Sequence, residues 1–194
     1  LVISGGSGTV SAANVATYSS SAINEGTLTL GNGANGGLAS NYTLTGHASS
    51  SFQINQRVLN SSGSRIYDGS TTASSSDLTL SNLVGTETLT LSGNGTLANA
   101  NVATNKSVTL NTLSIADGSN GGLAANYILA GGTHQLSVTK RVLNATGTRL
   151  YDASTNANSS DLSLGNLVGS ETLVLSGVGT VPDKNVATNK TISV

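Results

Sequence analysis

The chain has no cysteine, methionine or tryptophan, and its 194 residues include one proline and one phenylalanine. Without cysteine, disulfides and thiolate metal sites are excluded. Charged residues make up only 9% of the chain, against about 25% in a typical soluble domain. The net charge is −1, with eight lysines and arginines in total. Because this leaves no basic stripe for phosphates, we expect no nucleic-acid binding.

Further absences narrow the function. No stretch approaches 18 apolar residues, so we expect no membrane insertion. Acidic residues are scattered, whereas a calcium site needs about six to eight oxygen ligands, so we predict no metal site. No acid–base pair or Ser-His-Asp spacing recurs along the chain, and we therefore predict no cofactor, no catalytic residue and no enzyme activity. The two histidines, His47 and His134, are expected to be exposed in loops.

What the chain does have is a long internal repeat. Residues 57–110 reappear at 141–194 without a gap, offset by 84 positions, and 34 of the 54 aligned residues are identical. The start of the chain matches later segments in the same way: 8–17 resembles 95–104, and 35–42 resembles 120–127. We predict one complete module at 57–140, flanked by the C-terminal part of a module at 1–56 and the N-terminal part at 141–194. Tandem repeats of this kind serve reach or multivalency more often than catalysis.

Alternation of apolar and polar residues is the dominant short-range pattern. It is clearest in DLTLSNLV (77–84), ETLTLSG (87–93) and HQLSVTKRVL (134–143), and it has the period of half-buried strands. Gly/Asn clusters such as DGSNGG (117–122) separate these runs and favour tight turns. The pattern predicts an all-β fold with about seven or eight short strands in each module, arranged as tandem small β-sandwich-like units. A β-grasp-like module is the alternative. A parallel β-helix is less favoured because a coil-length period of about 20 residues is absent.

The predicted module boundaries fall inside alternating segments. SSSFQINQRVLN (49–60) and HQLSVTKRVLN (134–144) contain neither proline nor glycine. We expect one continuous strand to cross each boundary, which would make the array stiff and elongated.

A small set of polar and aromatic residues repeats in register. Arg65 precedes Asp68 by three positions, and Arg149 precedes Asp152 likewise, which favours a surface ion pair or backbone capping. Tyr67 and Tyr151 correspond to each other. With so few other aromatic residues, the tyrosines are expected to be core or rim residues with hydroxyls bonded to backbone.

Several ordered motifs identify a family resemblance. Tyr67-Asp68-Gly69 in RIYDGSTTA, NLVG followed by Glu87, PDKNV at 182–186 and Asn126-Tyr127 in GGLAANYIL together resemble the YDG-type repeat. That repeat occurs in very large exported bacterial proteins, including filamentous-haemagglutinin-like adhesins of the two-partner secretion type. The third module departs from the motif, with Ala153 in place of the glycine. Because a turn with positive φ strains alanine, we expect the two turns to differ.

The resemblance implies a role, without a catalytic residue. It implies a stalk or spacer in a secreted, cell-surface adhesin, of the kind found in biofilms, with the neighbouring repeats of the same chain as partners. The alternative is that the modules themselves bind extracellular polysaccharide or a host surface glycan, and gain avidity from their number.

Overall fold

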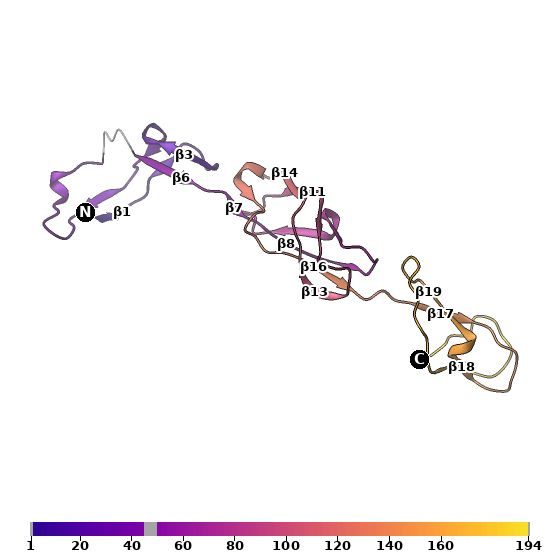
Figure 1. Ribbon diagram of the computed structural model, residues 1–194. Helices are drawn as coiled ribbons and strands as arrows, with labels where there is room; N and C mark the ends of the chain where they lie inside the picture. Colours follow the sequence, from indigo (N-terminus) through magenta and orange to yellow (C-terminus); the bar gives the residue numbers. More distant parts are fainter. Residues whose placement is uncertain (1, 45–49, 194) are drawn as a thin grey trace.

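The chain is all-β, as predicted. The computed structural model describes residues 2–44 and 50–193, and within them it has twenty short strands, five single-turn 3-10 helices and no α-helix. Figure 1 shows the strands gathered in three groups joined by extended segments. The sheets are small, and none of those described closes into a barrel. The 3-10 helices are Ser20–Ala22, Ala39–Asn41, Ser75–Asp77, Ala124–Asn126 and Ser159–Asp161.

The middle group lies within residues 57–140 and has ten strands, more than the seven or eight expected. They are β7 (Arg57–Val58), β8 (Asn60–Ile66), β9 (Thr72–Ser74), β10 (Leu78–Ser81), β11 (Leu89–Ser92), β12 (Asn94–Thr96), β13 (Ala103–Ser107), β14 (Ser114–Asp117), β15 (Tyr127–Ile128) and β16 (His134–Thr139). Gly/Asn turns follow several of them. At the tip between β14 and the 3-10 helix Ala124–Asn126, Asn120 and Gly121 have φ values of 57° and 86°.

The middle unit is closed by pairing between its two halves. Its four-stranded sheet has the order β10-β8-β16-β13, in which β8 and β16 are parallel and align His134 with Ser61 through Thr139 with Ile66. Strands β7 and β15 are also parallel, whereas β9–β12 and β11–β14 are antiparallel. The parallel central pair departs from the all-antiparallel sheets of a sandwich. It places the first and last long strands of the unit side by side.

The core of the middle unit draws on both halves of its sequence. Leu59, from the first half, and Leu136 and Val138, from β16, are its fully buried large side chains. Burying each such side chain contributes about 1.5–3 kcal/mol. The cluster is completed by Ala73, Leu78, Leu97, Val108, Leu113, Tyr127 and Leu129. Neither half can therefore bury its apolar surface alone.

The first group contains the strands expected for the second half of a unit. Its members are β1 (Val2–Gly5), β2 (Thr9–Val10), β3 (Ala16–Ser19), β4 (Ile23–Asn24), β5 (Thr29–Gly31) and β6 (Ser51–Ile54). They pair as β1–β5, β2–β4 and β3–β6, all antiparallel. By sequence alignment, β3 and β6 correspond to β13 and β16. Among the described residues, β6 has no strand on its other edge, where β8 lies in the middle unit.

The third group is the sparsest. It has β17 (Asn144–Gly147) paired with β19 (Leu162–Gly165), and β18 (Asn156–Asn158) paired with β20 (Val178–Thr180). These correspond to β8–β10 and β9–β12. No strand of this group pairs with either of the other two groups among the residues described. The predicted boundaries at 56/57 and 140/141 stay predictions, although all described strand pairings lie on one side or the other of each.

The continuous strands predicted across the boundaries are wrong. Strand β6 ends at Ile54 and β7 begins at Arg57, while β16 ends at Thr139 and β17 begins only at Asn144. Side chains of the following unit instead form hydrogen bonds with the backbone near the boundary. Asn166 Nδ2 donates to the Val142 carbonyl at 2.7 Å, which uses an acceptor that a continuous ladder would need.

Candidate functional site

The Tyr-Asp-Gly motif forms a turn held by a buried arginine. Arg65 Nη1 donates to Asp68 Oδ1 and Oδ2 at 2.8 and 2.6 Å, and Arg65 Nη2 donates to the Ser70 carbonyl. Asp68 Oδ1 also accepts from the Ser70 backbone N–H at 2.9 Å. Gly69, at φ 76°, lies between them. The arginine side chain is 9% exposed and the aspartate 47%, so the motif is a rim structure, and the predicted pair and the predicted capping both occur.

The third unit forms the same turn without the glycine. Arg149 pairs with Asp152 and donates to the Ser154 carbonyl, and Ser154 N–H donates to Asp152 Oδ1 at 2.9 Å. The hydrogen bond from Ser154, and then that from Arg149, lowers the pKa of Asp152. Ala153 adopts φ 63°. The expectation of different turns is therefore wrong, because the same polar contacts hold alanine in a conformation that costs about 1–2 kcal/mol.

The motif Asn126-Tyr127 links the two halves of the middle unit. Tyr127 is 3% exposed, its hydroxyl donates to the Glu87 carboxylate, and the Val84 N–H donates to it at 3.1 Å. Burial first, and then the bond to Glu87, raises the pKa of Tyr127. The predicted core role with a backbone-bonded hydroxyl is found here. The glutamate partner was not predicted, although NLVG-x-E repeats in register.

Asn126 faces the preceding unit. Its Oδ1 accepts from the Val15 N–H at 2.9 Å, and its Nδ2 donates to Asn14 Oδ1 at 3.0 Å. Gln56 Nε2 donates to the carbonyls of Ala125 and Tyr127, each at 3.1 Å. These bonds come from residues adjoining the motif on both sides of the predicted boundary. The first and middle units are thus joined by these polar contacts as well as by the covalent chain.

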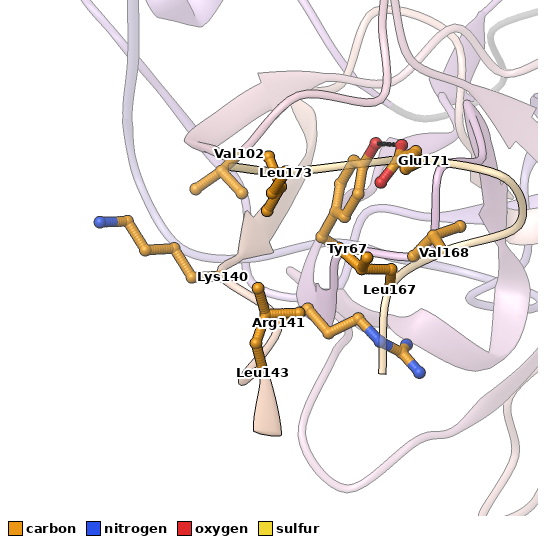
Figure 2. A pocket seen from close by; sticks show the side chains of 9 residues that line it. All are labelled: Tyr67, Val102, Lys140, Arg141, Leu143, Leu167, Val168, Glu171 and Leu173. Atoms are coloured by element: carbon orange, nitrogen blue, oxygen red, sulfur yellow. Dashed lines mark hydrogen bonds between the residues drawn. The ribbon is translucent and has the colours of Figure 1, made fainter. Parts of the chain in front are cut away.

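The second junction centres on Tyr67. Figure 2 shows its hydroxyl pointing at the carboxylate of Glu171, to which it donates a hydrogen bond that raises the pKa of Tyr67. The ring borders an open cavity of about 200 Å³. The other lining residues are Val102, Lys140, Arg141, Leu143, Leu167, Val168 and Leu173. The cavity wall is largely apolar, and Tyr67 joins the middle unit to the third. Tyr151, its counterpart, is 61% exposed.

A repeated arginine–asparagine clasp begins both units and was not predicted. Arg57 Nε donates to the Asn82 carbonyl at 2.6 Å, and Asn82 Nδ2 donates to the Val58 carbonyl at 2.6 Å. Arg141 and Asn166 repeat the arrangement, with Arg141 Nε at 2.7 Å from the Asn166 carbonyl. Both asparagines have positive φ. The clasp could have been predicted from the sequence, since arginine and asparagine recur 25 positions apart in both copies.

The lysine of each NVATNK segment binds back to its own loop. Lys190 Nζ lies 2.6 Å from Asp183 Oδ1, and this hydrogen bond is the main cause that lowers the pKa of Asp183. In the middle unit Lys106 Nζ lies 2.8 Å from Asn99 Oδ1 and 2.6 Å from the Asn101 carbonyl. The loop that precedes each NVATNK lysine is therefore held by that lysine in both copies, whether it carries an acid (Asp183) or an amide (Asn99).

The expectation of exposed histidines is wrong for His134, and His47 lies outside the described residues. His134 is 7% exposed at the start of β16. Its Nδ1 lies 2.9 Å from Ser61 Oγ and its Nε2 lies 2.8 Å from the Leu129 carbonyl. Since the carbonyl accepts only, Nε2 carries a proton and Ser61 donates to Nδ1. Both side chains are buried, so the pair ties β8 to β16 rather than exposing a nucleophile.

The polar side chains of the described residues form no candidate metal site. Among residues 2–44 and 50–193, no group of three or more histidine, cysteine or acidic side chains could hold a metal ion. No helix in this part of the chain is long and apolar enough to cross a membrane. The motif residues instead share a structural role, because they hold turns, join halves and touch neighbouring units.

Comparison with known proteins agrees with the motifs. The model of the YDG domain matches residues 53–135 and again 134–194, which together cover well over half of the chain. No curated protein and no solved structure matches it. The Tyr67-Asp68-Gly69 turn and its counterpart at Tyr151 each lie within one of the two matched segments. This chain belongs to the YDG domain family.

Proposed function

We propose that these repeats are stalk or spacer modules of a secreted or cell-surface bacterial adhesin, extending a binding region away from the cell. The observation that carries the proposal is that all described strand pairings stay within single units, while polar contacts join successive units. In a chain built this way, the contacts between successive modules fix the orientation of each module relative to the one before it. The two-partner secretion route is part of the same proposal, and it rests on the resemblance alone.

The junctions support a stiff, elongated array. Only residues 55–56 separate β6 from β7, and only 140–143 separate β16 from β17. An arginine–asparagine clasp follows the first of these segments and begins within the second. With so few free dihedral angles and with Asn126 and Tyr67 bonded across the junctions, large hinge motions would break several hydrogen bonds at once.

Surface composition fits an extracellular spacer. Only 9% of residues are charged, so the long-range repulsion between neighbouring surfaces is small. The polar surface is made of serine, threonine and asparagine, whose hydroxyls and amides remain hydrated at any pH of the environment.

The spacer proposal is tested by measuring distance distributions. The chain has no cysteine, so Ser40→Cys with Ser170→Cys places one spin label on the first and one on the third unit. Pulsed electron paramagnetic resonance on dilute protein should give a single narrow distribution. A pair within the middle unit, Ser81→Cys with Ser119→Cys, sets the width expected of a rigid body. A distribution several times broader than this control would contradict a stiff spacer.

The alternative function is that the modules bind polysaccharide or a host surface glycan. The exposed ring of Tyr151, 61% accessible on a surface rich in hydroxyls, is the observation that favours it. A glycan array probed with the fluorescently labelled chain separates the two functions. A pure spacer gives no signal above background, whereas a binder gives signals that Tyr151→Ala abolishes.

A further inference from the structure

One repeated loop faces the following unit at both junctions. We call it the NV loop, and it consists of residues 12–15 in the first unit and 99–102 in the middle unit. The first copy ends in Asn14-Val15, which Asn126 of the middle unit contacts with both polar atoms of its side chain. The second copy ends in Asn101-Val102, and Val102 borders the cavity of the second junction (Figure 2).

The NV loop is held in shape by residues that follow it closely. In the middle unit Lys106 Nζ donates to the Asn101 carbonyl at 2.6 Å. In the first unit Ser19 stands at the position of Lys106 and lacks the long amine. There the Tyr18 hydroxyl donates to the Asn14 carbonyl at 2.7 Å instead. Two different side chains thus fix the same carbonyl from four or five residues away, so the loop is formed locally in each unit.

The remaining polar groups of the first NV loop meet one side-chain amide. The Val15 N–H donates to Asn126 Oδ1 at 2.9 Å, and Asn126 Nδ2 donates to Asn14 Oδ1 at 3.0 Å. A primary amide carries its acceptor and its donors in one plane. The contact therefore has two points, and it fixes the direction of approach as well as the distance.

The covalent connection reinforces the turn that carries Asn126. Gln56, between β6 and β7, donates from Nε2 to the carbonyls of Ala125 and Tyr127, the residues on either side. Asn126 also ends the 3-10 helix Ala124–Asn126, and its N–H donates to a carbonyl of the preceding turn at 3.0 Å. Both sides of the contact are thus held before they meet.

We infer that the NV loop is a docking site for the asparagine of the Asn-Tyr motif in the following unit, and that this contact sets the orientation between the two units. The partner is a neighbouring module of the same chain, recognised by amide and backbone groups without charge. Tyr18 and Lys106 are positioning residues, because each acts through the carbonyl of the loop.

The Val15 amide reports docking directly, because its N–H is the donor to Asn126. In hydrogen exchange followed by NMR on the isotope-labelled chain, Asn126→Ala should speed the exchange of Val15 about tenfold or more. Ser11 N–H donates to the Ala22 carbonyl inside the first unit at 2.9 Å, and its exchange is the control. Equal Val15 exchange in the wild type and the variant, or a parallel change at Ser11, would overturn the inference.

Aspartate substitutions test the two-point geometry. Asn126→Asp should keep Val15 protected, because one carboxylate oxygen accepts from Val15 and the other accepts from the Asn14 amide once that amide turns over. Asn14→Asp should also keep it protected, since Asn126 Nδ2 then donates to a carboxylate. The two substitutions together bring like charges into contact and should release Val15 at pH 7. A single variant that releases Val15 as fully as the double variant would contradict this geometry.

The positioning role has its own test. Tyr18→Phe keeps the buried ring but removes the donor to the loop carbonyl, and should speed Val15 exchange about fivefold. Adding Ser19→Lys supplies the donor that Lys106 provides in the middle unit, and should restore the protection. Unchanged exchange in Tyr18→Phe, or no recovery with the lysine, would refute the role of Tyr18.

The inference deepens the spacer proposal and rests on it for its purpose, but the two fail separately. Rapid exchange at Val15 with a narrow distance distribution between Ser40→Cys and Ser170→Cys would refute docking and leave the stiff spacer. A protected Val15 that Asn126→Ala releases, together with a broad distribution, would support docking and contradict the stiff spacer. Protection and a narrow distribution together are the expected result.

Discussion

Residues 57–109 and 141–193 have closely similar sequences but different structures. In the first of these regions β8 runs through Ile66, and β11 and β13 are present; in the second, the counterparts at 148–150, 173–176 and 187–191 form no strand. The second region keeps two strand pairs, β17–β19 and β18–β20. In each of these pairs both strands lie within residues 141–193. Every strand that is lost corresponds to one that pairs with residues 111–139 in the middle unit.

Burial follows the same division. Val102 is 44% exposed and its counterpart Val186 is 87% exposed, while Ile66 and Leu150 differ as 60% and 91%. Since the two regions share most of their residues, local preference cannot explain the difference. The comparison shows that an alternating sequence allows a segment to form a strand. Whether the strand forms depends on the presence of a pairing partner.

The largest expected effect comes from truncating the strand that joins the halves. Leu136→Ala should destabilise the middle unit by about 2–5 kcal/mol, because Leu136 is fully buried and its loss leaves a cavity. Phe52→Ala, its counterpart in the first unit, should cost no more than about 0.5 kcal/mol because the ring is half exposed. Hydrogen exchange with mass spectrometry, read on peptides of the unit that carries each substitution, measures both. Similar costs would mean that the first unit is as closed as the middle one.

The next effect comes from the buried tyrosine. Tyr127→Phe removes the hydroxyl that satisfies Glu87 and the Val84 N–H, and should cost about 1–3 kcal/mol. Tyr42→Phe should cost almost nothing, since Tyr42 is exposed. The same exchange measurement applies, with peptides from each unit compared in one experiment.

The same tyrosine gives the middle unit a sensitivity to alkali. Because its pKa is raised in the folded protein, the folded state holds the phenol proton more tightly than the unfolded state. The resulting stability is fully present below about pH 10 and is lost as the pH rises above it. Unfolding midpoints from pH 8 to pH 11.5 should show the loss in the wild type and much less of it in Tyr127→Phe. An unchanged slope in the variant would assign the alkaline loss to another group.

A smaller effect separates the two Tyr-Asp-Gly-type turns. Ala153→Gly should stabilise the third unit by about 1 kcal/mol, because glycine adopts positive φ without strain. Gly69→Ala should destabilise the middle unit by a similar amount or more, since a Cβ there would lie 3.0 Å from Val168 Cγ1. Denaturant midpoints measure both changes. Opposite signs are required; a shared sign would mean that the two turns are not equivalent.

The smallest effect is at acid pH. The pKa of Asp183 is lowered in the folded state, so its contribution is present above about pH 4 and is lost as the pH falls through the folded value. Asp183→Asn copies the middle unit, where Asn99 binds the equivalent lysine. In this variant the third unit should lose less stability as the pH falls into the acid range. Asp77→Asn, at a carboxylate outside the lysine contact, is the control.

Local pattern predicted the strands better than their arrangement. The alternation in ETLTLSG and HQLSVT matches β11 and β16, and the Gly/Asn clusters match the turns. The parallel β8–β16 pair joins residues more than 70 positions apart, and no local feature of either strand encodes it. The burial of His134 could have been predicted from the sequence, because His134 lies in phase with Leu136 and Val138, the inward-facing positions of its own strand.

The motif residues show the same limit. In-register repetition correctly singled out Arg65 with Asp68 and Arg149 with Asp152, whose partners are three residues away. It could not show that Tyr67 reaches Glu171 of the next unit while Tyr127 reaches Glu87 of its own. Which carboxylate each tyrosine binds is a property of packing and not of spacing.

The most direct test of mutual closure is amide hydrogen exchange compared between the middle and third units of the same chain. Residues 64–66, 89–92 and 103–107 should exchange at least a hundredfold more slowly than their counterparts 148–150, 173–176 and 187–191. Residues 144–147 and 162–165, which keep their pairing, should remain protected. Equal protection of the two sets would show that these segments need no second half, and would contradict the account.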